Sequence, residues 1–135
     1  MGLSSRFPGQ MIPMVTESIV SDGMVVIVGV ADNACALPGG ASPTVSLLGV
    51  IYRPDGSSAA VGDTVDVIIS GVYPVIAAGS ITANNLITSG GTDGTAIAES
   101  AGSGVLVGVL GPALEDGVSG DRVATVINPF IKQGA

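Results

Sequence analysis

Short turn-forming pairs of glycine and aspartate recur along the whole chain and constrain its fold more than any other feature. Glycine adopts positive φ angles without strain and aspartate hydrogen-bonds its own backbone, so each pair favours a tight turn. With 21 glycines and 8 prolines, and no sustained apolar period of 3.6 residues, the chain offers little support for helices. The pairs are Asp22-Gly23, Gly39-Gly40, Asp55-Gly56, Gly62-Asp63, Gly90-Gly91, Asp93-Gly94, Asp116-Gly117 and Gly120-Asp121.

Runs of apolar and β-branched residues fill the intervals between these turns, at lengths typical of strands. In residues 64–69 the odd-numbered Val65, Val67 and Ile69 share one face, and residues 122–127 alternate in the same way. We therefore predict an all-β fold, either a small barrel or a sandwich, with little or no helix. The expected strands are residues 24–30, 45–52, 64–69, 71–76, 86–88, 105–110 and 122–127.

Two of these strands belong to an internal repeat. Leu48-Gly49-Val50 is followed by Gly62-Asp63 and the first alternating strand, and Val107-Gly108-Val109 is followed by Gly120-Asp121 and the second. The offsets are 59 and 58 residues. The repeat predicts two similar β units within one small domain.

The first twenty residues differ from the rest, because residues 7–14 are apolar, contain two prolines and show no period. Proline is disfavoured inside strands and helices, so we predict an extended N-terminal arm over residues 1–20. A single β domain follows over residues 21–131, and residues 132–135 form a C-terminal tail. Exposed apolar side chains on an arm would favour contact with a neighbouring subunit. The predicted subunit or capsid interface residues are Phe7, Met11, Ile12, Met14 and Phe130.

Charge is sparse and predominantly acidic. The 135 residues carry 11 acidic and 4 basic side chains, a formal net charge of −7. Nucleic-acid binding depends on lysine and arginine at the phosphates, so neither nucleic acid nor an anionic membrane is an expected partner. Charged residues are 11 % of the chain and the mean hydropathy is +0.66, against about 25 % charged residues in ordinary soluble domains. This composition favours extensive contact with other protein subunits.

The residues needed for catalysis or metal binding are scarce. There is no histidine, which removes the usual general base and the commonest metal ligand. Cys35 is the single cysteine, so no intrachain disulfide forms, and its neighbours Ala34 and Ala36 offer no activation. Asp63 and Asp66 lie close in sequence but lack the oxygen-rich surroundings of a calcium loop. We expect no enzyme activity, no cofactor and no metal.

Two segments resemble the capsid cement, or head decoration, proteins of tailed bacteriophages. The first runs from Gly71-Val72-Tyr73-Pro74-Val75 to Ala78-Gly79-Ser80-Ile81-Thr82-Ala83-Asn84-Asn85-Leu86, with Asn84-Asn85 in place of the family's usual Gly-Asp. The second runs from Val105-Leu106-Val107-Gly108-Val109-Leu110 to Gly120-Asp121-Arg122-Val123. The resemblance is looser elsewhere and covers roughly residues 23 to 128.

The resemblance implies a virion protein without catalytic residues, made in the host cytoplasm and placed on the outer surface of the capsid. It also implies self-association, as a homotrimer, and binding to the major capsid protein so that neighbouring capsid subunits are bridged. Two other functions remain open. One is another virion structural role, in a tail or fibre. The other is a small carbohydrate- or peptide-binding module, for which Tyr52 and Tyr73 are the only tyrosines.

Overall fold

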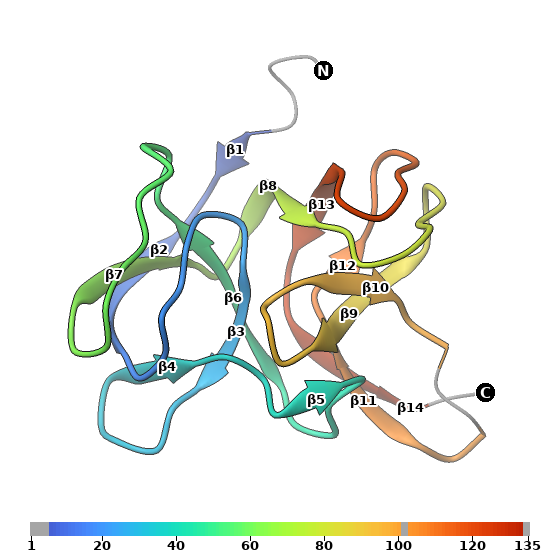
Figure 1. Cartoon of the computed structure of the whole chain (residues 1–135). Helices are drawn as coiled ribbons and strands as arrows, with labels where there is room; N and C mark the ends of the chain where they lie inside the picture. Colours follow the sequence, from blue (N-terminus) through green and yellow to red (C-terminus); the bar gives the residue numbers. More distant parts are fainter. Residues whose placement is uncertain (1–5, 101–102, 134–135) are drawn as a thin grey trace.

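A computed structural model describes residues 6–100 and 103–133, which form β-strands, turns and loops without a helix (Figure 1). The prediction of an all-β chain is confirmed. The strands are β1 (Phe7–Pro8), β2 (Met11–Thr16), β3 (Val25–Val28), β4 (Ala34–Ala36), β5 (Gly40–Ala41), β6 (Leu47–Tyr52), β7 (Thr64–Ile68), β8 (Gly71–Ile76), β9 (Leu86–Gly91), β10 (Ala96–Ala98), β11 (Leu106–Val109), β12 (Gly111–Pro112), β13 (Arg122–Ile127) and β14 (Phe130–Gln133).

Five strands in the first half of the chain close into a barrel, which we call the first barrel. Their order around the ring is β2-β4-β3-β6-β7, and β7 returns to β2 through an antiparallel ladder from Met11↔Ile68 to Val15↔Thr64. The β2–β4 pairing is parallel and short, at Val15↔Ala34 and Thr16↔Cys35. The first barrel is the left-hand lobe of Figure 1.

The second half of the chain repeats this ring, and we call it the second barrel. Its order is β8-β10-β9-β12-β13, in which β8 pairs with β13 and β9 pairs with both β10 and β12. Two isolated bridges complete the ring: the parallel Ala77↔Ala96 and the antiparallel Ala113↔Thr125. The second barrel is the right-hand lobe of Figure 1, beside the first.

Equivalent hydrogen bonds confirm the repeat. Thr16 N–H donates to Asp63 O at 3.0 Å, and 61 residues later Ala77 N–H donates to Asp121 O at 2.9 Å. The carboxylates of Asp63 and Asp121 each accept a backbone N–H from three residues upstream, at 2.9 Å in both cases. Positive φ angles also coincide: Gly23 with Asn84, Asn33 with Gly94, and Gly62 with Gly120.

The first element of the repeat was aligned incorrectly from the sequence. Ile51 N–H donates to Met24 O, as Ala113 N–H donates to Asn85 O, so the offset here is 62 residues and Gly49 corresponds to Gly111, not to Gly108. A Cβ on Gly49 would strike the carbonyl of Ile68, and one on Gly111 the carbonyl of Val126. Both glycines are therefore required where a neighbouring backbone approaches closely.

The N-terminal arm is corrected in the same way, because Met11–Thr16 is strand β2 of the first barrel. Pro13 is tolerated since alternate residues of a strand direct their backbone groups to opposite sides. Thr16 N–H points to β7, whereas Val15 N–H points to Asn33 on the other side, and Pro13 shares the side of Val15. Its missing N–H therefore falls outside the β2–β7 ladder. Pro74 stands at the equivalent position of β8.

The first and last described segments also join the domain. Phe7 and Pro8 pair with Val72 and Gly71 of β8, so the N-terminal segment crosses from the second barrel to the first. The C-terminal tail is corrected at Lys132 and Gln133, which belong to β14 and pair with β11. Residues 1–5 of the predicted arm and 134–135 of the predicted tail lie outside the described residues.

One buried cluster joins the barrels. The interior of the first barrel holds seven buried residues: Val20, Val26, Cys35, Ile51, Ala59, Val65 and Val67. The interior of the second barrel uses equivalent positions, among them Ile81, Ile87, Ala96, Ala113 and Val123. Its cluster also includes Val25, Leu47, Val50 and Ile68 from the outer face of the first barrel. The barrels therefore share one core, since neither buries these side chains alone.

Candidate assembly surfaces

The predicted interface residues lie on three strands and do not form one surface. Phe7 on β1, Met11 on β2 and Phe130 on β14 are exposed, so their side chains are available to a partner. Ile12 and Met14 are half-buried and pack against the interior cluster of the first barrel. An interface role for these five residues remains a prediction, in which Ile12 and Met14 act by holding β2 in the barrel.

The side chains of β2 alternate between the interior and the exterior of the first barrel. Ile12, Met14 and Thr16 face inward, whereas Met11, Pro13 and Val15 are exposed. This is the period of two that marks a strand with one buried face. The residue types do not show this alternation, because the exposed Met11 and Val15 are as apolar as the inward-facing Ile12 and Met14. One signal for the strand was available in the sequence. The pattern hydrophobic-Pro-hydrophobic-hydrophobic recurs at Tyr73-Pro74-Val75-Ile76, 61 residues after Ile12-Pro13-Met14-Val15.

A polar network at the junction of the barrels centres on Asp22, which is nearly fully buried. Its Oδ1 accepts hydrogen bonds from Tyr73 Oη at 2.9 Å and from Arg53 N at 2.7 Å. Its Oδ2 pairs with Arg122 Nη1 at 2.9 Å, and its carbonyl accepts from Arg122 Nη2 at 3.2 Å. Three donors, from Tyr73, Arg53 and Arg122, converge on the carboxylate of Asp22, so the network fixes how the barrels meet.

Tyr73 is at the centre of the same junction. It is buried, its ring meets Tyr52 edge-on at 5.5 Å between centroids, and the Arg6 guanidinium carbon lies 5.6 Å from its ring centroid. Desolvation by burial, reinforced by the hydrogen bond to Asp22 and by its charge, raises the pKa of Tyr73 to about 12. Its phenol therefore stays protonated as a donor, and Tyr73 cannot serve as a sugar-stacking platform at the surface.

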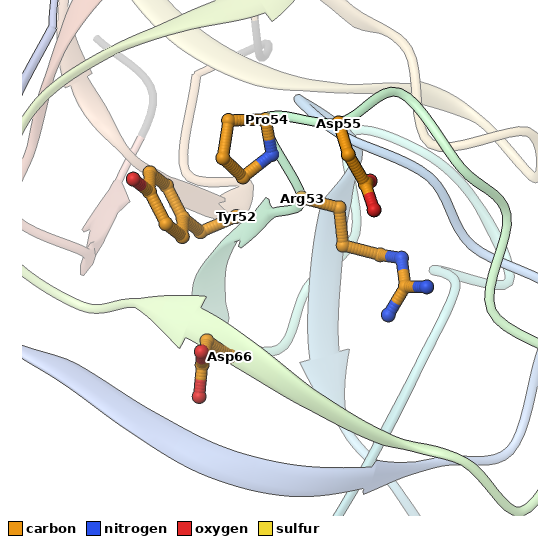
Figure 2. A pocket seen from close by; sticks show the side chains of 5 residues that line it. All are labelled: Tyr52, Arg53, Pro54, Asp55 and Asp66. Carbon is orange, nitrogen blue, oxygen red and sulfur yellow. The ribbon is translucent and has the colours of Figure 1, made fainter.

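A shallow hollow of about 280 Å³ lies beside this junction and is lined by Tyr52, Arg53, Pro54, Asp55 and Asp66 (Figure 2). Tyr52 and Asp66 are partners in the β6–β7 register. The hollow arises from a difference between the barrels, because seven residues, 52–58, connect Ile51 to Ala59, whereas three residues, 114–116, connect the equivalent Ala113 to Gly117.

Two charged groups of the hollow, Arg53 and Asp55, are engaged within its own loop. Asp55 Oδ1 accepts hydrogen bonds from Ser57 N at 3.0 Å and Ser57 Oγ at 2.9 Å, and these bonds lower the pKa of the Asp55 carboxyl. Arg53 donates from Nε to Ser57 O and from Nη2 to Ser57 Oγ. Figure 2 shows Tyr52 and Pro54 on one side and the heads of Arg53 and Asp55 on the other. The hollow can receive a partner's side chain, but it lacks a nucleophile paired with a base.

The other candidate chemistry from the sequence was Cys35 and the pair Asp63 and Asp66. Cys35 is buried inside the first barrel, and this burial raises the pKa of its thiol. Asp63 caps its own turn through the Ala60 N–H. Across residues 6–100 and 103–133, no three His, Cys, Asp or Glu side chains gather as a metal site, and no helix could cross a membrane.

Comparison with known proteins finds the fold of this chain among solved structures. No protein-family model and no curated protein sequence matches the chain. The crystal structure of the N base of head fiber gp8.5 in bacteriophage phi29 is similar, with a TM-score of 0.64 and 20 % sequence identity. The similarity covers 88 % of this chain and 93 % of that chain. At this level of identity the comparison shows that the two proteins share a fold along nearly their whole lengths.

Proposed function

We propose that this chain is a structural protein of a bacteriophage virion that attaches to the head. The observation that carries the proposal is the fold shared with the N base of a phage head fiber over 88 % of this chain. Fold alone does not determine function. The composition and the surface of this chain support the same conclusion.

The surface supports a binding role. Large apolar side chains are exposed on the first barrel and on strands outside both rings, including Val30, Val61, Phe7 and Ile131. Only 11 % of the residues are charged, so few ionic groups would lose hydration in a contact with another subunit. Exposed apolar surface of this kind is typical of proteins that bury it in an assembly.

More specifically, we propose that the chain is a cement protein on the outer surface of the capsid. It would bind the major capsid protein, associate as a homotrimer and bridge neighbouring capsid subunits, as the resemblance of residues 23 to 128 implies. Several modest contacts on one oligomer would then add through avidity. The proposal assigns the chain no catalytic activity, no cofactor and no nucleic-acid partner.

A second candidate is the base of a head fibre. The similar structure is itself described as the N base of a head fiber, which favours this function as much as the cement function. The two candidates share attachment to the head. They differ in whether the bound protein strengthens the shell.

Purified expanded heads of the cognate phage, prepared without this protein, test both candidates. Sedimentation with added protein should show saturable binding, and light scattering of the free protein should show a discrete oligomer. For a cement protein we expect bound heads to resist heating at temperatures that empty unbound heads. Binding without this protection would favour the fibre base, and absence of binding would overturn the proposal.

A further inference from the structure

One end of the first barrel carries exposed apolar side chains on several neighbouring segments. It consists of Val15, Ile19, Val28, Val30 and Val61, which we call the distal patch. Val30 is fully exposed at 100 %, and the others range from 41 % for Val15 to 66 % for Ile19. Val15 and Ile19 lie at and just after the end of β2, Val28 and Val30 at the end of β3 and in the loop that follows it, and Val61 in the turn before β7. These segments meet at the lower left of Figure 1.

Hydrogen bonds hold these segments together. Val15 N–H donates to Asn33 O at 2.9 Å, and Gly62 N–H donates to Thr16 O at 2.9 Å. The Glu17 carboxylate accepts from Val30 N at 2.9 Å and from Ala31 N at 2.8 Å, and these bonds lower the pKa of Glu17. Val30 is therefore fixed at the tip of a braced loop, so little conformational entropy remains to be lost when a partner binds.

The second barrel has a different surface at the equivalent positions. Ser80 corresponds to Ile19, Ser89 to Val28, Gly91 to Val30 and Ser119 to Val61. Strand β5 also covers this part of the second barrel, through Gly40↔Gly91 and Ala41↔Gly90, and Ser89 is buried. Strand β5 therefore covers the second barrel near Ser89 and Gly91, whereas Ser80 and Ser119 are small, polar and exposed. At these four positions the first barrel carries exposed valine or isoleucine, and the fifth, Val15, corresponds to the half-buried Ile76.

The charges around the distal patch indicate the chemistry of its partner. Its rim is acidic, with Glu17, Asp32 and Asp63 on the same three segments. All four lysine and arginine side chains are engaged elsewhere: Arg6 at Tyr73, Arg53 at Ser57, Arg122 at Asp22 and Lys132 at Glu99. Two copies meeting through this end would bring like charges together, which disfavours self-association here.

We propose that the distal patch docks into an apolar depression rimmed by lysine or arginine on a different protein, which is the coat protein of the head. Naming the head rests on the proposed function, whereas the apolar and basic chemistry of the partner rests on the patch itself. The valines supply the buried centre of this interface, and the carboxylates of the rim steer and orient the approach.

The test compares two matched double variants with the wild type in binding to purified heads that lack this protein. V30S/V61S replaces two exposed valines of the patch with a small polar residue, and L114S/V118S removes two exposed apolar side chains, at 51 % and 60 %, from the second barrel. We expect V30S/V61S to bind at least about tenfold more weakly, since each valine buries apolar surface on docking, and L114S/V118S to bind as the wild type does. Wild-type affinity should also fall as salt rises. Unchanged binding by V30S/V61S, with the same thermal stability as the wild type, would overturn the docking proposal.

A second measurement separates this proposal from the proposed function, should the wild type not bind heads at all. A benzophenone amino acid replaces Val30, with Leu106 as the control position, in infected cells. Cross-linking from position 30 to a mapped site flanked by lysine or arginine on another protein would support the patch while the head function fails. Cross-links to second copies alone, or none, would overturn the patch as well.

Discussion

The two barrels share a ring order but differ in how they are completed. The first closes through continuous ladders, whereas the second relies on two isolated bridges at Ala77↔Ala96 and Ala113↔Thr125. The second gains support from outside its ring: β1 pairs with β8, and β5 pairs with β9. Its core also takes in Val50 and Ile68 from the first barrel.

Some features are shared by both barrels and build the ring. Other segments belong to one barrel only and decide which of its outer surfaces are covered. Turns with positive φ and close-approach glycines recur in both barrels and set the ring. The added segments decide which surfaces are covered. They lie mostly against the second barrel, so the distal patch of the first is left for a partner.

The largest expected effect tests the equivalence of Gly49 and Gly111. We expect G49A and G111A each to destabilise the fold by about 3 kcal/mol, because the new Cβ would meet a backbone carbonyl that cannot move aside as a flexible side chain can. The midpoint of urea unfolding measures this. G79A is the control, since nothing lies within 4 Å of a Cβ at Gly79. A well-tolerated G111A beside a damaging G49A would break the equivalence.

The next effect concerns the carboxylate that joins the barrels. Asp22 corresponds to Ala83 in the second barrel, so D22A gives both barrels the same residue. We expect a loss of about 2 to 3 kcal/mol, because Tyr73 Oη and the Arg53 N–H lose their buried acceptor. Chemical unfolding checks this, with D32A at an exposed acid as the control. A change within about 0.5 kcal/mol for D22A would show that packing alone sets the junction.

The pH dependence of the free energy of unfolding tests the same junction, through Tyr73. The native phenol of Tyr73 keeps its proton up to about pH 12, whereas an unfolded tyrosine loses it near pH ~10. Between these values the unfolded state binds fewer protons, so the free energy of unfolding falls as pH rises. The contribution is complete below the unfolded pKa and is lost as pH rises towards the native value. Urea unfolding from pH ~9 to ~11 should show this decline in wild type and Y52F, and a flatter profile in Y73F.

Much of the second barrel could be predicted from the sequence. The predicted strands 71–76 and 122–127 match β8 and β13, since their β-branched residues lie between clear turn signals. Strands β4 and β10 were missed because they are short and alanine-rich, and alanine has little strand preference. Strand β2 was missed because it contains Pro13. A proline within a short apolar run is typical of a break between elements, although here its missing N–H lies on the side of the strand away from β7.

The surfaces were harder to predict than the strands. Residues 24–30 read as one apolar strand, but β3 ends at Val28 and the chain turns, so Val28 and Val30 reach the surface. Which apolar residue of a half-buried run becomes exposed depends on where the ladder stops. That depends on partners distant in sequence, such as Leu47 opposite Ile27 and Cys35 opposite Val28.

The smallest expected effect compares Cys35 with Ala96, its equivalent in the second barrel. C35A should cost about 1 kcal/mol or less, because it removes one buried sulfur from a position that the second barrel fills with alanine. The native thiol should resist an aromatic disulfide reagent, since burial raises its pKa and excludes the reagent. Its modification rate then reports opening of the first barrel. Rapid modification without denaturant, faster than global unfolding, would show that this barrel opens on its own despite the shared core.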